Sequence, residues 1–180
     1  MKNANPVSRG LAVAAIAWAS FGLVACAREQ TAAAAPAAAP AKTAADFFPI
    51  KIGERTVRLQ LAVRPHEMQR GLMERRDLGK DDGMIFVYDK PQQMNFWMRN
   101  TPTPLDIGFF GPDGALAEVY PLHPFDEKTV SSRGKELRFA VETNQGWYAA
   151  NGVKPGQKLD LKALAAALKE RGFDPKRYGL

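Results

Sequence analysis

The segment from Met94 to Phe110, MNFWMRNTPTPLDIGFF, limits the possible folds of this chain more than any other. Pro102 and Pro104 lack a backbone donor and hold the residue before each of them in an extended conformation, which excludes a helix here. On both sides of the prolines, apolar residues alternate with other residues, as in half-buried strands. The segment is therefore predicted to form two strands joined by a rigid bend.

The bend also brings together side chains that could bind a ligand. If the two strands pair as a hairpin, Trp97, Arg99 and Asp106 share the face opposite the core, and Asn100 lies at the bend. Trp97 offers a flat apolar surface, and the other side chains can orient polar groups through directional hydrogen bonds. The alternative is that these residues only fix the bend. In that case Asp106 caps the turn or pairs with Arg99, and Trp97 contributes packing.

Four strings of this sequence resemble the family called domain of unknown function 192. They are RGLMER (70–75), DDGMIFVY (81–88), FWMRNTPTPLDIGFF (96–110) and AVETNQGWYAANGVKPGQKL (140–159). The resemblance covers residues 47–161 and implies a compact antiparallel β-sandwich or barrel. It implies no catalytic residue, because no activity is established for the family.

Patterns elsewhere predict the remaining elements of a mainly β domain. Alternation predicts strands at 47–52, 55–63, 84–88, 115–122, 137–142 and 157–161. Pro65 suits the first turn of a short helix over 65–74, and a helical turn is expected at 147–151. Leu161, Leu164 and Leu168 recur at helical spacing before Gly172, which predicts a C-terminal helix. The expected fold is a compact antiparallel β-sandwich or barrel with one short helix and a C-terminal helix.

The first 25 residues have the pattern of a secretory signal. Lys2 and Arg9 precede an apolar run that ends Leu-Val-Ala-Cys, with the cysteine at Cys26. This ending resembles the lipobox of bacterial lipoproteins, in which cleavage before the cysteine lets that residue carry several acyl chains and anchor stably. Ala27, rather than Asp, follows the cysteine, which favours the outer membrane, facing the periplasm, in a Gram-negative cell. An ordinary signal peptide with an incidental cysteine is the alternative.

Residues 26–46 are predicted to be a tether rather than part of the folded domain. The segment is rich in alanine and proline and has no large apolar side chain to pack. Such a segment would span roughly 25 Å as a coil and about 65 Å when extended. Residues 47–180 are then a single globular β domain.

Charge and cysteine content exclude several classes of function. Removal of residues 1–25 takes away Lys2 and Arg9, so the formal charge falls from +6 to +4. The basic residues are scattered and match no nucleic-acid-binding motif, so no nucleic-acid partner is expected. Cys26 is the only cysteine. The mature domain therefore lacks a disulfide, a thiol nucleophile and a cysteine-based metal site. A monomer without a cofactor is expected.

Two alternative functions involve other side chains. Glu142 is expected to point away from the core, toward the face assigned to Asp106. The two could act as paired carboxylates in a hydrolytic enzyme if they lie within about 5 to 10 Å. Thioethers are soft ligands suited to Cu(I), and five methionines lie close together in the sequence: Met68, Met73, Met84, Met94 and Met98. Packing explains these methionines better, because Met94 and Met98 alternate with Phe96 on the core face.

The sequence therefore favours a ligand- or partner-binding module for a small polar ligand, a glycan or a peptide. The candidate binding residues are Trp97, Arg99, Asn100, Asp106 and Glu142. Hydrolysis by paired carboxylates and methionine-based Cu(I) binding remain the alternatives, and no metal site is assigned.

Overall fold

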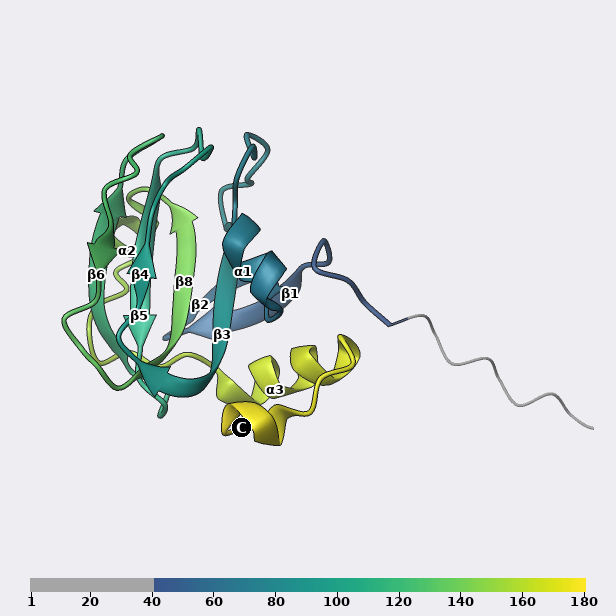
Figure 1. Cartoon of the computed structure of the whole chain (residues 1–180). Coiled ribbons are helices and arrows are strands. Elements are labelled where there is room, and N and C mark those ends of the chain that lie inside the picture. Colours follow the sequence, from purple (N-terminus) through teal and green to yellow (C-terminus); the bar gives the residue numbers. More distant parts are fainter. Residues whose placement is uncertain (1–40) are drawn as a thin grey trace, which may run out of the picture. The chain divides into compact units, whose positions relative to one another are not determined.

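β-Strands make up most of the regular structure in residues 41–180, the part of the chain that the computed structural model describes (Figure 1). The strands are β1 (Phe48–Ile52), β2 (Arg55–Ala62), β3 (Asp82–Gln92), β4 (Asn95–Phe96), β5 (Leu105–Phe110), β6 (Leu116–Leu122), β7 (Val130–Ser131) and β8 (Leu137–Asn144). The helices are α1 (Pro65–Arg70), α2 (Trp147–Ala150), α3 (Leu161–Glu170) and the 3-10 helix η1 (Pro175–Tyr178). The predicted signal peptide, Cys26 and most of the tether lie outside the described residues.

A six-stranded sheet in the order β1-β2-β3-β8-β5-β6 forms the centre of the domain, and β4 and β7 form a separate two-stranded sheet. The prediction of a mainly β fold is confirmed. The large sheet is open and mixed rather than wholly antiparallel, because β2 and β3 run parallel. Parallel neighbours need a crossover connection, and here the crossover contains α1.

Both faces of the large sheet are buried. On one face, Ile85, Val87 and Val141 pack with side chains of α2 and α3. On the other face, Met84 and Phe86 form a second apolar cluster with side chains of residues 94–98, which we call the β4 segment. A polar side chain in the middle of β3, β5 or β8 therefore points into a core whichever face it occupies.

The hairpin considered as a possible pairing of the two strands at the proline bend does not form. Strand β4 pairs with β7, and β5 lies between β6 and β8. Every residue of β5 is buried, and both edges of this strand are already paired, which leaves no edge for β4. The strand expected from Met94 onward is therefore reduced to Asn95 and Phe96.

The helices follow the predicted pattern with shorter bounds. Helix α1 ends at Gly71, whose φ of 47° takes the chain out of the helix. Helix α3 is confirmed, and the Asp160 side chain caps it by accepting a hydrogen bond from the backbone N–H of Ala163 at 2.9 Å. The strand predicted at 157–161 is instead two isolated bridges, made by Lys158 and Leu159.

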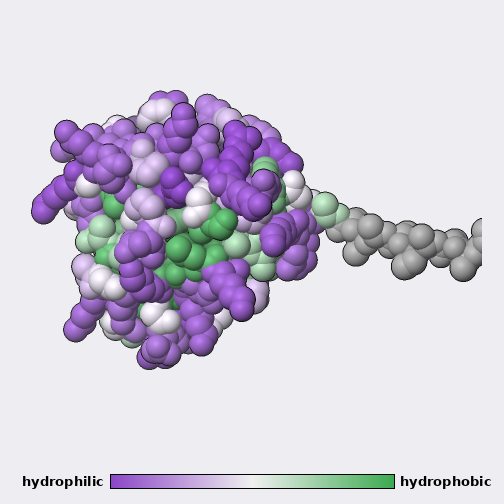
Figure 2. All heavy atoms as spheres, turned by 90° about the horizontal axis from the view of Figure 1, so that it is seen from below, coloured by the Kyte–Doolittle hydropathy of each residue, from purple (hydrophilic) through white to green (hydrophobic). Residues whose placement is uncertain are grey.

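The surface of the described domain is mostly hydrophilic. Figure 2 shows the domain from below relative to Figure 1. On that side, one patch of hydrophobic side chains is bordered by hydrophilic residues. Within residues 41–180, no helix has both the length and the apolar character needed to span a membrane.

Candidate functional site

A cavity of about 170 Å³, which we call the Glu142 cavity, lies between the large sheet, helix α1 and the β4 segment. The sheet contributes Phe86, Tyr88 and Glu142. Helix α1 and the turn after it contribute residues 68–73, and the β4 segment contributes residues 95–97 together with Thr101. Three segments that are far apart in the sequence thus enclose one space.

Glu142 reaches the cavity through the register of the sheet. It lies on β8, directly between Met84 of β3 and Ile107 of β5. Paired residues of neighbouring strands point to the same face, so the carboxyl lies on the apolar face that carries the second core cluster. Glu142 is 4% exposed, and its carboxyl makes no hydrogen bond to any other residue of the described domain.

This environment keeps the carboxyl in its neutral form. Burial raises the pKa of Glu142 from the ordinary value of 4.5 to about 8, so the group is mainly protonated at neutral pH. An acid in this position is therefore unfavourable for stability, which is typical of functional groups rather than of packing.

Tyr88 is the second polar group of the cavity without a partner. It lies on β3 on the same face as Glu142, and its hydroxyl makes no hydrogen bond to another described residue. Burial, and then the nearby Glu142, raise the pKa of Tyr88 to about 12. Both groups can therefore donate a hydrogen bond into the cavity at neutral pH.

Aromatic rings supply much of the remaining surface. Phe96 packs edge-on against Phe86, with ring centroids 4.9 Å apart, and its centroid lies 5.8 Å from that of Phe109 on β5. These contacts hold the β4 segment over the sheet. Trp97 follows at the opening of the cavity and is 43% exposed.

A second, shallower space adjoins the cavity, and we call it the outer hollow. It has a volume of about 400 Å³ and shares Gln69, Arg70, Met73 and Trp97 with the cavity. Its other residues are His66, Glu74 and Arg99. A ligand could therefore place one end against Glu142 and the rest of its structure outside.

Arg99 lies at the edge of the outer hollow but does not pair with Asp106. Its guanidinium donates two hydrogen bonds to one carboxylate oxygen of Glu127, at 3.0 and 2.8 Å. The same guanidinium lies 4.6 Å from the centroid of the Trp97 ring. The predicted alternative of an Arg99–Asp106 pair is wrong, and Arg99 instead orients the indole at the cavity opening.

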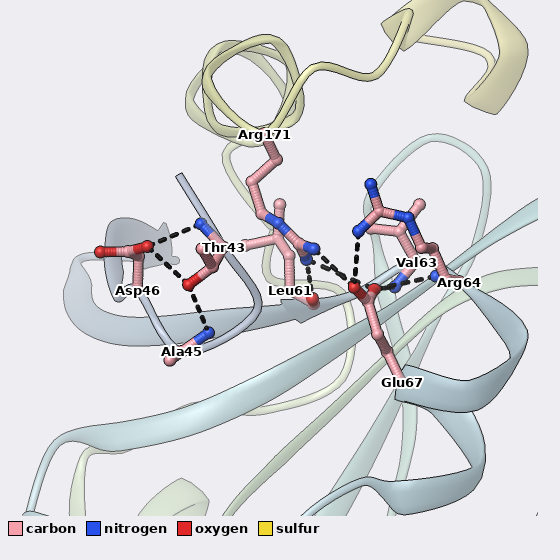
Figure 3. Close-up of polar contacts among 8 residues, drawn as sticks. All are labelled: Thr43, Ala45, Asp46, Leu61, Val63, Arg64, Glu67 and Arg171. Carbon is pink, nitrogen blue, oxygen red and sulfur yellow. Dashed lines mark hydrogen bonds and ion pairs between the residues drawn. The ribbon is translucent and has the colours of Figure 1, made fainter. Parts of the chain in front are cut away.

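Helix α1 is held in place by a buried ion pair with the C-terminal helix (Figure 3). Arg171, at the end of α3, donates to a carboxylate oxygen of Glu67 at 2.6 Å and to the carbonyl of Leu61. Burial acts to raise the pKa of Glu67, but hydrogen bonds from Arg171 and from the backbone of Arg64 and Val63 outweigh it and hold the pKa at about 2. Glu67 precedes the cavity residues of α1, so this ion pair fixes one side of the cavity.

Asp106 lies on the opposite face from Glu142. It is paired in register with Thr143, whereas Glu142 is paired with Ile107. The Asp106 carboxyl is buried and accepts a hydrogen bond from the backbone N–H of Gly146 at 2.8 Å. Burial raises its pKa, and the bond from Gly146 opposes this rise. The predicted pair of carboxylates on one face is therefore wrong, because the sheet separates the two groups.

Asn100 is exposed and contributes backbone geometry. Its φ of 54° is left-handed, and its carbonyl accepts a hydrogen bond from the N–H of Glu74 at 2.7 Å. Asn100 lines another shallow hollow with Glu74, Arg76, Pro102 and Phe125. Of the five predicted site residues, the structure brings Trp97 and Glu142 to the cavity, and the remaining three lie elsewhere.

The sequence pattern did not predict that Tyr88 and residues 68–73 line the site. One signal was available, because the run from Met84 to Tyr88 is apolar or aromatic without interruption. Such a run is typical of a strand buried on both faces. A strand paired with it is also buried, so Glu142 could have been placed inside the domain rather than on its surface.

The methionines mainly fill the second core. Met84, Met94 and Met98 are buried there among apolar side chains, and Met68 and Met73 line the Glu142 cavity. Residues 41–180 contain no cluster of three or more His, Cys, Asp or Glu side chains arranged to hold a metal ion.

The chain is similar to proteins whose descriptions assign little function. A family model described as DUF192, Uncharacterized ACR, matches residues 48–161, a range that contains every residue of the cavity. A protein of unknown function from Novosphingobium aromaticivorans DSM 12444 is 37% identical, with a TM-score of 0.61 over 68% of this chain and 93% of that one. A protein from Sinorhizobium meliloti 1021, provisionally described as a transcription regulator, is 28% identical, with a TM-score of 0.62 over 66% of this chain and 95% of that one. A search of curated proteins found no match.

Proposed function

The chain belongs to the DUF192 family of uncharacterised proteins, and from the geometry of its cavity we propose that it is an envelope-anchored module that binds a small ligand above Glu142. The ligand fills the Glu142 cavity and extends into the outer hollow. The binding module is a mainly β domain, and the lipid anchor at Cys26 places it in the periplasm at the outer membrane.

The burial of an unpartnered Glu142 carboxyl carries this proposal. Leucine or glutamine at this position would avoid the cost of burying an acid in a sheet interior. The carboxyl lines a cavity with a second unpartnered group, the Tyr88 hydroxyl, beside it. A cavity in which polar groups of shifted pKa converge beside apolar side chains is a usual form of a small-molecule site.

The size of the cavity limits what can enter it. Its volume of about 170 Å³ equals that of roughly five or six water molecules. A whole oligosaccharide or peptide does not fit, so the cavity takes either a free small molecule or one terminal group of a longer ligand. The half-exposed Trp97, oriented by Arg99, covers the part of the ligand that leaves the cavity.

The anchor rests on the sequence at Cys26 and on the tether that follows. Residues 27–46 allow the domain to stand off the membrane surface. Where the tether meets the domain, the backbone N–H of Lys42 donates to the carbonyl of Glu170 at 3.1 Å.

A ligand-observed NMR screen of the mature chain tests the proposal. Saturation-transfer spectra are recorded with a mixture of small amines, monosaccharides and dipeptides. We expect hits that disappear in Met68→Trp, which fills the cavity, and that persist in Asp106→Asn, which changes a buried carboxyl on the other face. Circular dichroism checks folding, and Met73→Trp is a second blocking variant. The absence of any hit, or hits that survive both blocking variants, would contradict the proposal.

A further inference from the structure

We propose that the ligand of the Glu142 cavity is a small organic cation, an alkylammonium group held between the Glu142 carboxylate and the aromatic side chains around it. This inference rests on the binding function proposed above and adds the chemical class of the ligand. Two features of the cavity support it: the aromatic and thioether side chains in its lining, and an acid without a resident counter-charge.

Six of the thirteen residues that line the cavity carry an aromatic ring or a thioether. The aromatic residues are Phe86, Tyr88, Phe96 and Trp97, and the thioethers are Met68 and Met73. A ring face attracts a cation, and this attraction is stronger where water is excluded. Polarizable thioethers pack well against methyl and methylene groups. An alkylated ammonium group combines a positive charge with an apolar surface and so matches both kinds of wall.

The cavity contains an acid without a resident counter-ion. Arg70 is the only lysine, arginine or histidine that lines it, but the Arg70 side chain is 71% exposed and lies 3.7 Å from Glu74. Its charged end is therefore in solvent, and its stem forms the wall. A cationic ligand would supply the counter-charge that favours the ionised carboxylate, whereas an anionic ligand would favour the protonated acid.

The polar side chains of the lining do not exclude a neutral ligand by themselves. The Thr101 hydroxyl donates to the carbonyl of Arg99 at 3.2 Å, and the side-chain oxygen of Asn95 accepts from Ser131 at 2.6 Å. Gln69, Tyr88 and Glu142 also line the cavity, and their side chains make no hydrogen bond to another described residue. Uncharged probes are therefore needed to separate recognition of charge from recognition by these polar groups.

Binding of a cation has a proton signature that binding of a neutral ligand lacks. The charged or titratable groups that face Glu142 are Tyr88 from β3 and Arg70 from α1, while β5 presents the apolar Ile107. Tyr148 and Asp106 lie on the other face of the sheet. Because burial raises the pKa of Glu142 to about 8, the empty site holds a proton at pH 7. A bound cation favours the ionised form, so this proton is released.

Calorimetry with matched probes tests the inference on the mature full chain. Choline and n-butylammonium are titrated at pH 7, together with their uncharged counterparts 3,3-dimethylbutan-1-ol and n-butanol. Each titration is repeated in phosphate and in MOPS, whose different ionisation enthalpies reveal the number of protons released. We expect at least one cation to bind about tenfold or more tightly than its uncharged counterpart, with release of close to one proton.

Two variants assign the effect to Glu142. Glu142→Gln keeps the shape of the side chain, and it should weaken cation binding by about tenfold or more and abolish proton release. Asp106→Asn should leave both unchanged. Equal or tighter binding of the uncharged probes, cation binding without proton release, or no cation binding at millimolar concentration would each overturn the inference. Hits of another class in the NMR screen that are lost in Met68→Trp would still support a small-ligand site.

Discussion

Asp106 and Glu142 are buried on opposite faces of the same sheet, on the adjacent strands β5 and β8. Asp106 is partnered, because it accepts a hydrogen bond from the N–H of Gly146. Glu142 has no partner in the described domain and lines a cavity. One carboxyl thus stabilises a turn and the other is available to a ligand, and each provides the control for experiments on the other.

The first prediction concerns the effect of Glu142 on stability. Its pKa is about 8 in the folded protein and 4.5 in the unfolded chain, so between these values the folded state holds more protons. Stability contributed by the protonated group is present below pH 4.5 and is lost as the pH rises toward 8. Relative to Glu142→Gln, the wild type should lose about 3 kcal/mol between pH 4 and pH 7.

Urea unfolding of both proteins at several pH values between 4 and 8 measures this difference. Asp106→Asn is the control, and its difference from the wild type should change less with pH because Gly146 partners the aspartate. A constant difference between the wild type and Glu142→Gln from pH 4 to pH 8 would show that Glu142 is not buried as a neutral acid.

A second prediction concerns the ion pair between Glu67 and Arg171. Arg171→Met removes the buried partner of the Glu67 carboxylate and leaves only the half-exposed Arg64, 3.0 Å away, to pair with it, which should cost about 3 kcal/mol. The double variant Glu67→Gln/Arg171→Met should be more stable than Arg171→Met alone, because no buried charge remains. Thermal unfolding at pH 7 measures the three variants. A double variant less stable than Arg171→Met would contradict this account.

The same ion pair predicts an acid limb of the stability curve. Hydrogen bonds hold the pKa of Glu67 at about 2, below its unfolded value of 4.5. The stability it contributes is present above pH 4.5 and is lost as the pH falls toward 2. Melting temperatures between pH 2 and pH 6 should therefore fall more steeply for the wild type than for Glu67→Gln. Parallel curves would mean that Glu67 is not held in its ionised form.

A third prediction separates the Trp97 ring from the core. Loss of a core aromatic side chain typically lowers the free energy of unfolding by about 3 to 5 kcal/mol. Because Trp97 is 43% exposed, Trp97→Ala should lower it by much less. Phe139→Ala, at a fully buried position, is the control that should show the full cost. Thermal melts compare the two. A Trp97→Ala protein as unstable as Phe139→Ala would place the indole in the core and remove it from the site.

A fourth prediction concerns location. Cys26 should be the first residue of the mature protein and should carry acyl chains, since it follows Leu-Val-Ala at the end of the apolar run. Mass spectrometry of the mature N-terminus decides this, and Cys26→Ala should release the protein from the membrane fraction. A mature chain that begins at another residue with a free amine would contradict it.

The sequence predicted local elements better than their pairing. Strands appear where alternation is clear, and α3 forms where leucines recur at helical spacing. A hairpin at the proline bend was considered as a possible pairing, but the partners of β4 and β5 depend on strands β7 and β8, which lie much later in the chain. Strand pairing at that separation is set by the whole sheet and leaves no local signal.

The surroundings of Glu142 also depend on segments that are distant in the sequence. Alternation in β8 correctly separated Glu142 from Phe139 and Val141. It could not show that the other face is also covered, because the cover comes from α1 and the β4 segment. The candidate residue was thus available from sequence, whereas its burial and its cavity required the tertiary structure.

The most direct test of the Glu142 site is the ¹³C resonance of its carboxyl carbon in the mature protein, assigned by its absence in Glu142→Gln. Ligands found in the NMR screen are added at a constant pH of 7. The account predicts that the Glu142 resonance shifts on saturation and that the Asp106 resonance, from the other face of the same sheet, does not. Binding that leaves the Glu142 resonance unchanged would contradict a ligand site in this cavity.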